Sequence, residues 1–520
     1  YSRLSKSLAA DCCRIIELAR ANEVSCTFFW NTSGLDNFRP AEERKFEWSE
    51  PNSRYLKPLA HKPYESEYAW WEQSSGYRPG YSFEKLRYTF RPLAIVVKEE
   101  RTQFFTNRII PHTVYVVNEL PGDADGYLTI SIQQNDRELH SKRTAMGIDR
   151  GKTGESHFDL FMENVEPGNL QVITRFECSL GNDEVVRNIR ITDPHQLQKS
   201  ISLQKITILG KSRAEHCFRL VGIDPVIIET IDSRKPAETP VLIVAENYIE
   251  AGSDINQKLR KYVSTGGRVL ILEQKNSPFP DFRIERMPIE FGHIRDFEHP
   301  VVSGLVKDDL RYFGDDPFGL PTSDSWITVF PYVKSESDKT IRSIIDCSAG
   351  DFASGGFSWS PLVEARIGNG AVIASQLRIS DRLIDIPAAT RILVNSLNYL
   401  ASYKPESICK ITCSDEIPAE LSDWIESSSG DGSDVVVMHA DEISPEITDD
   451  LCESVKNGGK VVVFGLSPET IDLWSDVTGA NIEVFVPEHE VYQLVRTQEH
   501  SLLRGLNNED TCWLDNWTYK

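Results

Sequence analysis

The stretch that decides the fold runs over residues 255–272 and reads INQKLRKYVSTGGRVLIL. Its first part has apolar residues at the three- and four-residue spacing of an amphipathic helix: Ile255, Leu259 and Val263. Gly266 and Gly267 follow, and glycine is the residue that most often ends a helix. The short apolar run 269–272 then predicts a buried strand.

Further short apolar runs flank this helix and strand on both sides. Upstream they are 206–209, 226–228 and 241–244, and downstream there is one, 371–376. A helical pattern over 387–399 follows this last predicted strand. Strands that alternate with helices indicate a parallel sheet covered on both faces. We therefore predict a doubly wound α/β domain, of the flavodoxin-like kind, over residues 204–402.

The same unit occurs a second time. Residues 266–272, GGRVLIL, return as 458–464, GGKVVVF, and residues 298–305, EHPVVSGL, return as 499–506, EHSLLRGL. The apolar helix positions also recur, as Ile447, Leu451 and Val455. We predict a second α/β domain over 406–520, which lacks a counterpart of residues 370–399 and is expected to be truncated.

Upstream of these domains the apolar period changes to two. Candidate strands are separated by turn signals at 121–123 and 167–169, and they cover residues 95–97, 113–117, 127–132, 157–161, 170–174 and 185–191. This pattern over 91–195 predicts an immunoglobulin-like β-sandwich.

The first 90 residues form the remaining part. Residues 4–19 have a helical apolar pattern with Arg14, Glu17 and Arg20 predicted on the outer face, and the apolar run 24–30 predicts a buried strand ending in Trp30. A helix leading into such a strand is typical of an α/β barrel, and a single such unit predicts that the chain enters the barrel at its last turn. Residues 35–90 are rich in aromatic side chains and are expected to form a long loop.

Composition excludes several classes of partner. The net charge of −22 disfavours nucleic acid and anionic membranes, and no apolar run approaches the roughly 20 residues of a membrane span. The ten cysteines have no zinc-site spacing, so we expect buried thiols, no metal and no cofactor.

Three loose motifs in fixed order carry a family resemblance. Residues 91–97 (RPLAIVV), 104–107 (FFTN) and 114–118 (VYVVN) resemble the sandwich that follows the barrel in family 2 glycoside hydrolases, which include β-galactosidases and β-glucuronidases, and residues 28–31 (FFWN) resemble the eighth barrel strand of that family. The resemblance implies a retaining, exo-acting β-glycosidase with a carbohydrate substrate, and by analogy a periplasmic or secreted location. Its two catalytic glutamates belong to barrel strands four and seven. They would lie upstream of Tyr1, so no residue of this chain is expected to be catalytic, and the chain alone is expected to be inactive.

A second resemblance covers residues 204–400, which are similar to the class I glutamine amidotransferase-like fold. Active members carry a cysteine on the turn after the strand that is 269–272 here, but this chain has Glu273 and Gln274 there, and Gly465 and Leu466 in the second copy. The late histidine and glutamate are also missing after Gln376. Both domains are therefore expected to be non-catalytic and to serve domain packing or homo-oligomer assembly.

Four residues are candidates for sugar binding. Trp30, at a barrel strand end, is expected to stack on a sugar ring, although a buried core tryptophan would give the same pattern. Asn31 either binds a hydroxyl group or caps the turn. Trp70 and Trp71 either line the rim of a subsite or form a small core of the loop. An alternative function is a non-enzymatic carbohydrate-binding or scaffold protein with a degenerate barrel. His299 and His500 recur without a nucleophile beside them, which indicates a structural role.

Overall fold

The computed structural model describes two compact units, one centred on residues up to Tyr403 and one that begins at Lys404. The described residues are 2–24, 38–40, 77–79, 81–161, 165–200 and 205–482, the last range with gaps at 216–217, 219–223, 233–234, 240, 280–281, 312, 314–325, 335–340, 349–357, 406–410 and 414–434.

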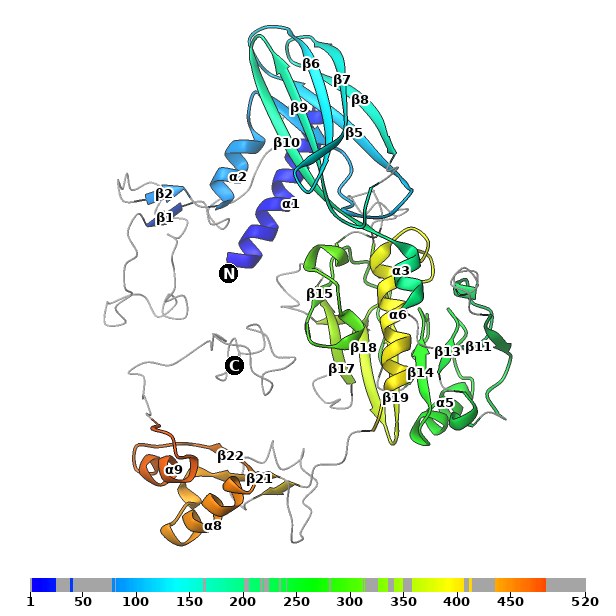
Figure 1. Ribbon diagram of the computed structural model, residues 1–520, viewed down its shortest axis with the longest axis vertical. Coiled ribbons are helices and arrows are strands. Elements are labelled where there is room, and N and C mark those ends of the chain that lie inside the picture. Colours follow the sequence, from blue (N-terminus) through cyan, green and yellow to red (C-terminus); the bar gives the residue numbers. More distant parts are fainter. Residues whose placement is uncertain are drawn as a thin grey trace. The chain divides into compact units, whose positions relative to one another are not determined.

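The first unit opens with two helices (Figure 1). Helix α1 spans Ser2–Ala21 and helix α2 spans Tyr81–Thr89, and the two pack against each other. The short strands β1 (Phe38–Pro40) and β2 (Tyr77–Pro79) pair antiparallel. The prediction of a loop over 35–90 is thus wrong for α2, because its helical pattern is weak and a helix this short needs packing partners to be stable.

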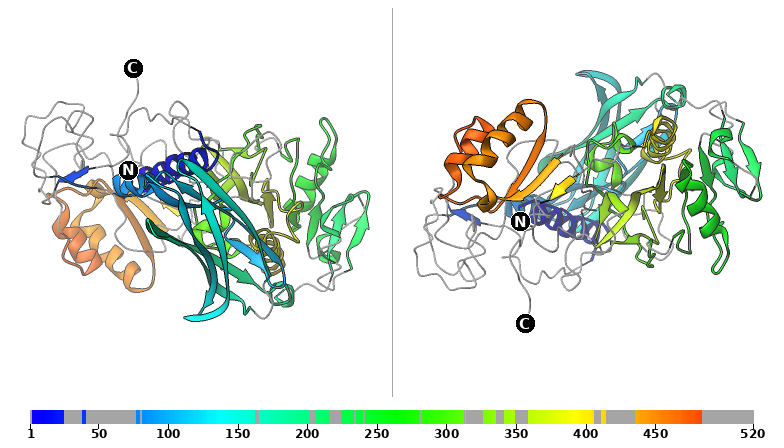
Figure 2. Two further views of the ribbon diagram at one scale, coloured as in Figure 1. Left: turned by 90° about the horizontal axis from the view of Figure 1, so that it is seen from above. Right: turned by 90° about the horizontal axis from the view of Figure 1, so that it is seen from below.

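A β-sandwich follows, and its two sheets enclose one apolar core (Figure 1). The three-stranded sheet has the order β3 (Leu93–Val97), β5 (Ile109–Asn118), β8 (Lys152–Phe161). The five-stranded sheet has the order β4 (Gln103–Phe105), β10 (Gly181–Thr192), β9 (Gly168–Cys178), β6 (Ala124–Gln134), β7 (Arg137–Ile148). All neighbours pair antiparallel except β4 and β10, and the long strands twist together (Figure 2).

Helix α1 covers the outer face of the three-stranded sheet. Leu18 and Ala21 pack on Val96 and Val117, whose side chains point away from the sandwich core. Arg20 was predicted to face solvent, but it is only 7% exposed. Its guanidinium group lies over the sheet edge, where it donates to the carbonyl oxygens of Thr89 and Arg91 and to the Glu119 carboxylate. The polar side of the helix is therefore also an interface.

The first α/β domain is built on a mixed sheet whose order is β12, β11, β13, β14, β19, β18, β17, β15, with β16 beside β18. The parallel part comprises β11 (Thr207–Leu209), β12 (Val226–Ile228), β13 (Leu242–Val244), β14 (Arg268–Ile271) and β19 (Gly370–Ser375). The antiparallel part comprises β15 (His293–Ile294), β16 (Tyr332–Val333), β17 (Ile341–Cys347) and β18 (Trp359–Ile367).

Apolar side chains on both faces of this sheet are buried, as a doubly wound fold requires. Helix α6 (Pro387–Ser402) closes the larger core on one face, and helix α5 (Ile255–Ser264) closes the core on the other face (Figure 1). The remaining short elements of this unit are α3 (Pro194–Lys199) and the 3₁₀ turns η4 (Pro236–Glu238), η5 (Pro300–Val302) and η6 (Lys307–Leu310).

The second unit contains a smaller parallel sheet with the order β20 (Ile411–Cys413), β21 (Val435–His439), β22 (Lys460–Phe464). The turn η7 (Ala440–Glu442) and helix α8 (Pro445–Lys456) connect β21 to β22, and helix α9 (Ile471–Thr478) packs with α8 around Trp474. Gly266 and Gly458, which precede β14 and β22, both have positive φ angles, of 104° and 90°. The two glycine pairs therefore make the same left-handed turn after their helices.

The described residues form a multidomain protein with both α/β and β-rich parts, and this broad prediction is confirmed. Residues 25–30 of the predicted strand 24–30, which is the basis for the barrel interpretation, lie outside the described residues.

Candidate functional site

The strand order of the first α/β domain identifies one edge of its sheet as the place for a ligand. In the sheet, β11 lies between β12 and β13. The chain therefore runs from β11 to β12 on one side, and then crosses back to β13, β14 and β19 on the other side. Open α/β sheets bind ligands where this order reverses, just beyond the carboxyl ends of the strands. Here that point lies between β11 and β13.

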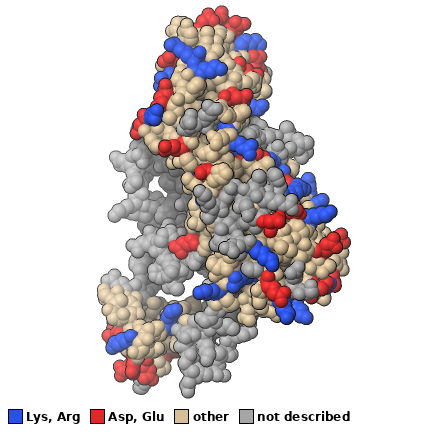
Figure 3. Space-filling view, turned by 45° about the vertical axis from the view of Figure 1, so that its right-hand side comes forward, with Lys and Arg blue, Asp and Glu red and all other residues tan. Residues whose placement is uncertain are grey.

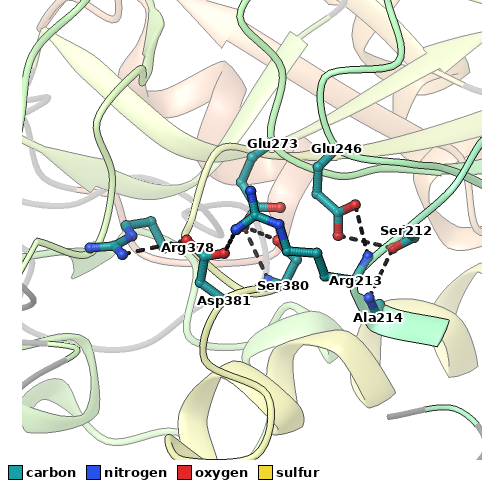
Figure 4. Close-up of polar contacts among 8 residues, drawn as sticks. All are labelled: Ser212, Arg213, Ala214, Glu246, Glu273, Arg378, Ser380 and Asp381. Carbon is teal, nitrogen blue, oxygen red and sulfur yellow. Dashed lines mark hydrogen bonds and ion pairs between the residues drawn. The ribbon is translucent and has the colours of Figure 1, made fainter. Parts of the chain in front are cut away.

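Six polar residues meet at this edge, which we name the carboxyl-edge cluster (Figure 4). They come from the loops after β11, β13, β14 and β19, and they are Ser212, Arg213, Glu246, Glu273, Ser380 and Asp381. Gly210 starts the first of these loops with a φ of 89°, and a Cβ atom there would lie 2.4 Å from the Tyr248 ring. Only glycine gives the chain this turn out of β11.

Glu246 is held by the loop after β11. The Ser212 hydroxyl donates to Glu246 Oε1 at 2.9 Å, and the backbone N–H of Arg213 donates to Oε2 at 3.3 Å. The hydroxyl in turn accepts from the N–H of Ala214 at 3.0 Å. Both carboxylate oxygens of Glu246 thus have a partner, and the side chain is fixed at the switch point.

Glu273 has a partner on one oxygen only. Its Oε1 accepts from the backbone N–H of Ser380 at 3.1 Å and from the Ser380 hydroxyl at 2.9 Å. Its Oε2 is buried and has no hydrogen-bond partner among the described residues. The carboxyl group is enclosed by protein atoms, although part of the residue reaches the surface.

Burial, with a smaller contribution from the nearby charge of Glu246, raises the pKa of Glu273 to about 7, against the opposing effect of its own backbone N–H and of the hydrogen bonds from Ser380. Near neutral pH, Glu273 therefore exchanges a proton within reach of the Glu246 charge. A carboxyl group of this kind can both donate and accept a hydrogen bond.

Arg213 connects the two outer loops of the cluster. Its guanidinium group forms an ion pair with Asp381, and Arg378 approaches the other oxygen of Asp381 at 3.4 Å. Figure 4 shows the Arg213 side chain extending past Glu246 toward Asp381, with its guanidinium end in front of the Glu273 carboxyl group. The Arg213 side chain is 65% exposed, so this ion pair lies at the surface of the cluster.

The neighbouring glutamines serve the fold. Gln274 is only 1% exposed, and its side-chain amide donates to the carbonyl oxygens of Ala245 and Leu272, both at 2.7 Å. Gln376 joins β19 to β14, since it accepts from the N–H of Gln274 at 2.7 Å and donates to its carbonyl oxygen at 3.0 Å. The cluster contains no thiol and no imidazole, so its chemistry is that of hydrogen bonding and proton exchange.

The second unit presents a different edge. The register of β21 on β22 places Ala440 where the first domain has Glu246, and Gly465 where it has Glu273. The His439 imidazole packs on Gly465, where an added Cβ atom would lie 2.3 Å from its Nε2 atom. The described part of the second unit has no carboxylate pair at these positions.

Comparison with known proteins gives no family. No family model and no curated protein matches the chain. Among solved structures, a beta-glucosidase from Listeria innocua matches with 12% identity over 20% of this chain and 16% of that chain, at a TM-score of 0.15. A transglutaminase from red sea bream matches with 18% identity over 23% of this chain and 22% of that chain, at a TM-score of 0.18. The CARDB domain of a Pyrococcus furiosus protein matches with 12% identity over 20% of this chain and 91% of that domain, at a TM-score of 0.16.

These likenesses are weak structural similarities to about a fifth of the chain. The chain spans less than a quarter of the beta-glucosidase and of the transglutaminase. At such scores they assign no fold and no activity.

The sequence-predicted sugar-binding residues Trp30, Asn31, Trp70 and Trp71 lie outside the described residues, as does His500. His299 is described and is 1% exposed; its Nδ1 accepts from the N–H of Val301, and its Nε2 lies 3.6 Å from Glu364. These contacts agree with a structural role.

Sequence reasoning did not find the carboxyl-edge cluster. The available signal was polar residues within five positions of the ends of four apolar runs, 206–209, 241–244, 269–272 and 371–376.

No group of three or more His, Cys, Asp or Glu side chains in the described parts of the chain has metal-binding geometry. Nor is any helix there long and apolar enough to cross a membrane. On the face drawn in Figure 3, acidic and basic side chains are interspersed.

Proposed function

We propose that this chain is the support region of a retaining, exo-acting β-glycosidase of the family 2 type, whose catalytic glutamates belong to barrel strands outside this sequence. The observation that carries the proposal is the packing of α1 and α2 on the sandwich. Residues 22–80 separate the two helices in sequence, yet the helices lie side by side, and α2 leads directly into β3 (Figure 1).

Successive outer helices of an α/β barrel have this arrangement, since each is followed by a strand and a loop before the next helix. The contacts of α1 with the sandwich are specific. Arg14 donates to the carbonyl oxygen of Val97 at 2.7 Å, and Arg20 pairs with Glu119 at 2.9 Å. These contacts join α1 to the sandwich, which in this proposal holds the last part of the barrel against the next domain.

In this proposal the substrate is a carbohydrate, and Trp30 provides an aromatic platform for the sugar ring. Asn31 binds a hydroxyl group, and Trp70 and Trp71 line the rim of the subsite. Stacking on an indole face contributes about 1 kcal/mol beyond simple burial. The α/β domains would serve domain packing or homo-oligomer assembly.

The test compares this chain with the longest reading frame that contains it, on a panel of chromogenic β-glycosides. We expect turnover by the longer protein only. In that protein, Trp30→Ala should lower kcat/KM about tenfold, from the lost stacking and burial. Tyr127→Ala changes an exposed aromatic residue of the sandwich and should leave kcat/KM unchanged.

Two outcomes would overturn the proposal. Turnover by the chain itself would place catalytic carboxylates within it. A longer protein that folds and binds polysaccharide but cleaves none of the glycosides would favour the non-enzymatic, carbohydrate-binding alternative.

A further inference from the structure

We propose that the carboxyl-edge cluster of the first α/β domain binds a small neutral polyhydroxy molecule, a sugar or a polyol, whose hydroxyl groups bridge Glu246 and Glu273. This inference goes beyond the support function, because it assigns a ligand site to a domain whose role in the glycosidase proposal is domain packing or homo-oligomer assembly. It involves neither α1 nor the sandwich.

The position of the cluster is the first argument. Four loops that follow four neighbouring parallel strands supply its side chains, and the two glutamates extend from the adjacent strands β13 and β14 into the same space (Figure 4). Ligands of open α/β sheets bind at this edge, because the loops there differ freely while the strands hold their ends in place.

The second argument is an unused acceptor. Glu246 has a donor on each of its two oxygens, and Glu273 has two donors on Oε1. Of these four carboxylate oxygens, Oε2 of Glu273 is the one that is buried without a hydrogen-bond partner among the described residues. Buried polar atoms rarely stay unpaired in folded proteins, and an unpaired one indicates a missing partner. A ligand hydroxyl group would supply it.

The charges select the class of ligand. Two facing carboxyl groups repel an anion, and the pKa of Glu273, raised to about 7, disfavours two negative charges side by side near neutral pH. A cation needs both groups ionised, and it would also lie close to the Arg213 guanidinium group. Neutral hydroxyl groups donate to one carboxylate and accept from the other carboxyl group, so they match a pair that carries one proton.

The second unit is an internal contrast. It has the same strand, helix and strand, yet Ala440 and Gly465 occupy the two glutamate positions. We therefore expect one ligand per chain, in the first domain.

The test uses the purified chain and isothermal titration calorimetry. The probes are glucose, galactose, mannose, glycerol and myo-inositol, with putrescine as the cationic probe and inorganic phosphate as the anionic probe. We expect saturable binding of at least one neutral probe at millimolar affinity or tighter, and no comparable binding of putrescine or phosphate.

Variants locate the binding. Glu273→Leu removes both oxygens and should weaken binding about tenfold or more, the usual effect of losing a hydrogen bond to a charged or protonated carboxyl group. Glu273→Gln keeps one donor and one acceptor and should stay within about threefold of the unchanged protein. Glu184→Gln, at an exposed ion pair of the sandwich, is the matched control and should have no effect.

Circular dichroism and the thermal midpoint establish that each variant is folded. If Glu273→Leu does not fold, Glu246→Ala replaces it with the same expected loss. The inference is overturned if no neutral probe binds, if putrescine or phosphate binds more tightly, or if binding survives Glu273→Leu or Glu246→Ala unchanged. Because no glycoside is hydrolysed in this experiment, its outcome is independent of the glycosidase proposal.

Discussion

The proton on Glu273 makes the stability of the first α/β domain depend on pH in an unusual direction, and Glu273→Gln isolates that effect. Burial and the charge of Glu246 raise the pKa of Glu273 from an ordinary 4.5 to about 7. The folded protein thus binds this proton more tightly than the unfolded chain does. The resulting stabilisation is fully present below pH 4.5 and is lost as the pH rises through 7.

The magnitude follows from the size of the pKa change. Each tenfold change in proton affinity corresponds to about 1.4 kcal/mol, which gives about 3 kcal/mol in full. Because part of the residue is exposed, solvent screening reduces this to roughly 2 kcal/mol between pH 5 and pH 8. For a domain of this size, that free energy corresponds to a change of about 4–8 °C in the thermal midpoint.

The glutamine variant lacks the titration but keeps the shape of the side chain and an oxygen to accept from Ser380. We expect the unchanged protein to lose stability relative to Glu273→Gln as the pH rises from 5 to 8. The measurement is the difference between the two thermal midpoints at each pH, so that titrations common to both cancel. Glu184→Gln, at an exposed ion pair of the sandwich, is the matched control. Parallel curves for Glu273→Gln and the unchanged protein would show that Glu273 titrates normally, and would refute the reasoning.

Three further predictions concern other parts of the chain. Arg20→Ala leaves buried carbonyl oxygens unpaired and should cost about 3 kcal/mol, measured as faster limited proteolysis of α1 with the sandwich still intact. Burial and the Arg187 charge lower the pKa of His112 to about 3, so the sandwich should lose stability as the pH falls below 6.5. In acid unfolding at pH 4, His112→Gln should remove about 3 kcal/mol of that loss. The added Cβ atom of Gly458→Ala meets no atom within 4 Å, so this variant should lose only about 1 kcal/mol of unfolding free energy, from backbone strain. Gly459→Ala brings a Cβ atom to 2.8 Å from the Ser454 carbonyl oxygen, and its loss in urea unfolding should be at least twice as large.

Helices and strands could be predicted from the sequence where buried apolar residues recur at a regular spacing. The helix and strand of 255–272, their glycine turn and the parallel strands before them could be predicted, because each carries an apolar pattern that matches its geometry. Strand β7 could not: most of its residues are exposed, and it is held by pairing with β6. Strand β18 is almost fully buried, yet Ser360, Pro361 and Glu364 interrupt its apolar run, so the antiparallel half of the sheet gave no signal.

The candidate site was missed for a different physical reason. Its residues are spread from Ser212 to Asp381, and they meet only because the strand order places β11, β13, β14 and β19 side by side. Local patterns predict strands, but the order of strands depends on contacts between distant residues. The turn after β14 did attract attention in the sequence, as the place where a thiol is missing. The residue at that turn is Glu273, whose carboxyl group can itself exchange a proton near neutral pH.

The contrast between the two units bears on whether the second is a copy that has lost its site. Gly465 has a φ of 72°, a conformation that glutamate adopts only at a cost of about 1–2 kcal/mol, and the His439 imidazole fills the space where a side chain would start. The backbone after β22 therefore does not admit the carboxylate that the first domain carries at Glu273. Restoring the pair would require a new loop path as well as two substitutions. The repeated strand–helix–strand framework and the chemistry at its edge are thus separate properties, and similarity of the framework is no guide to what either edge binds.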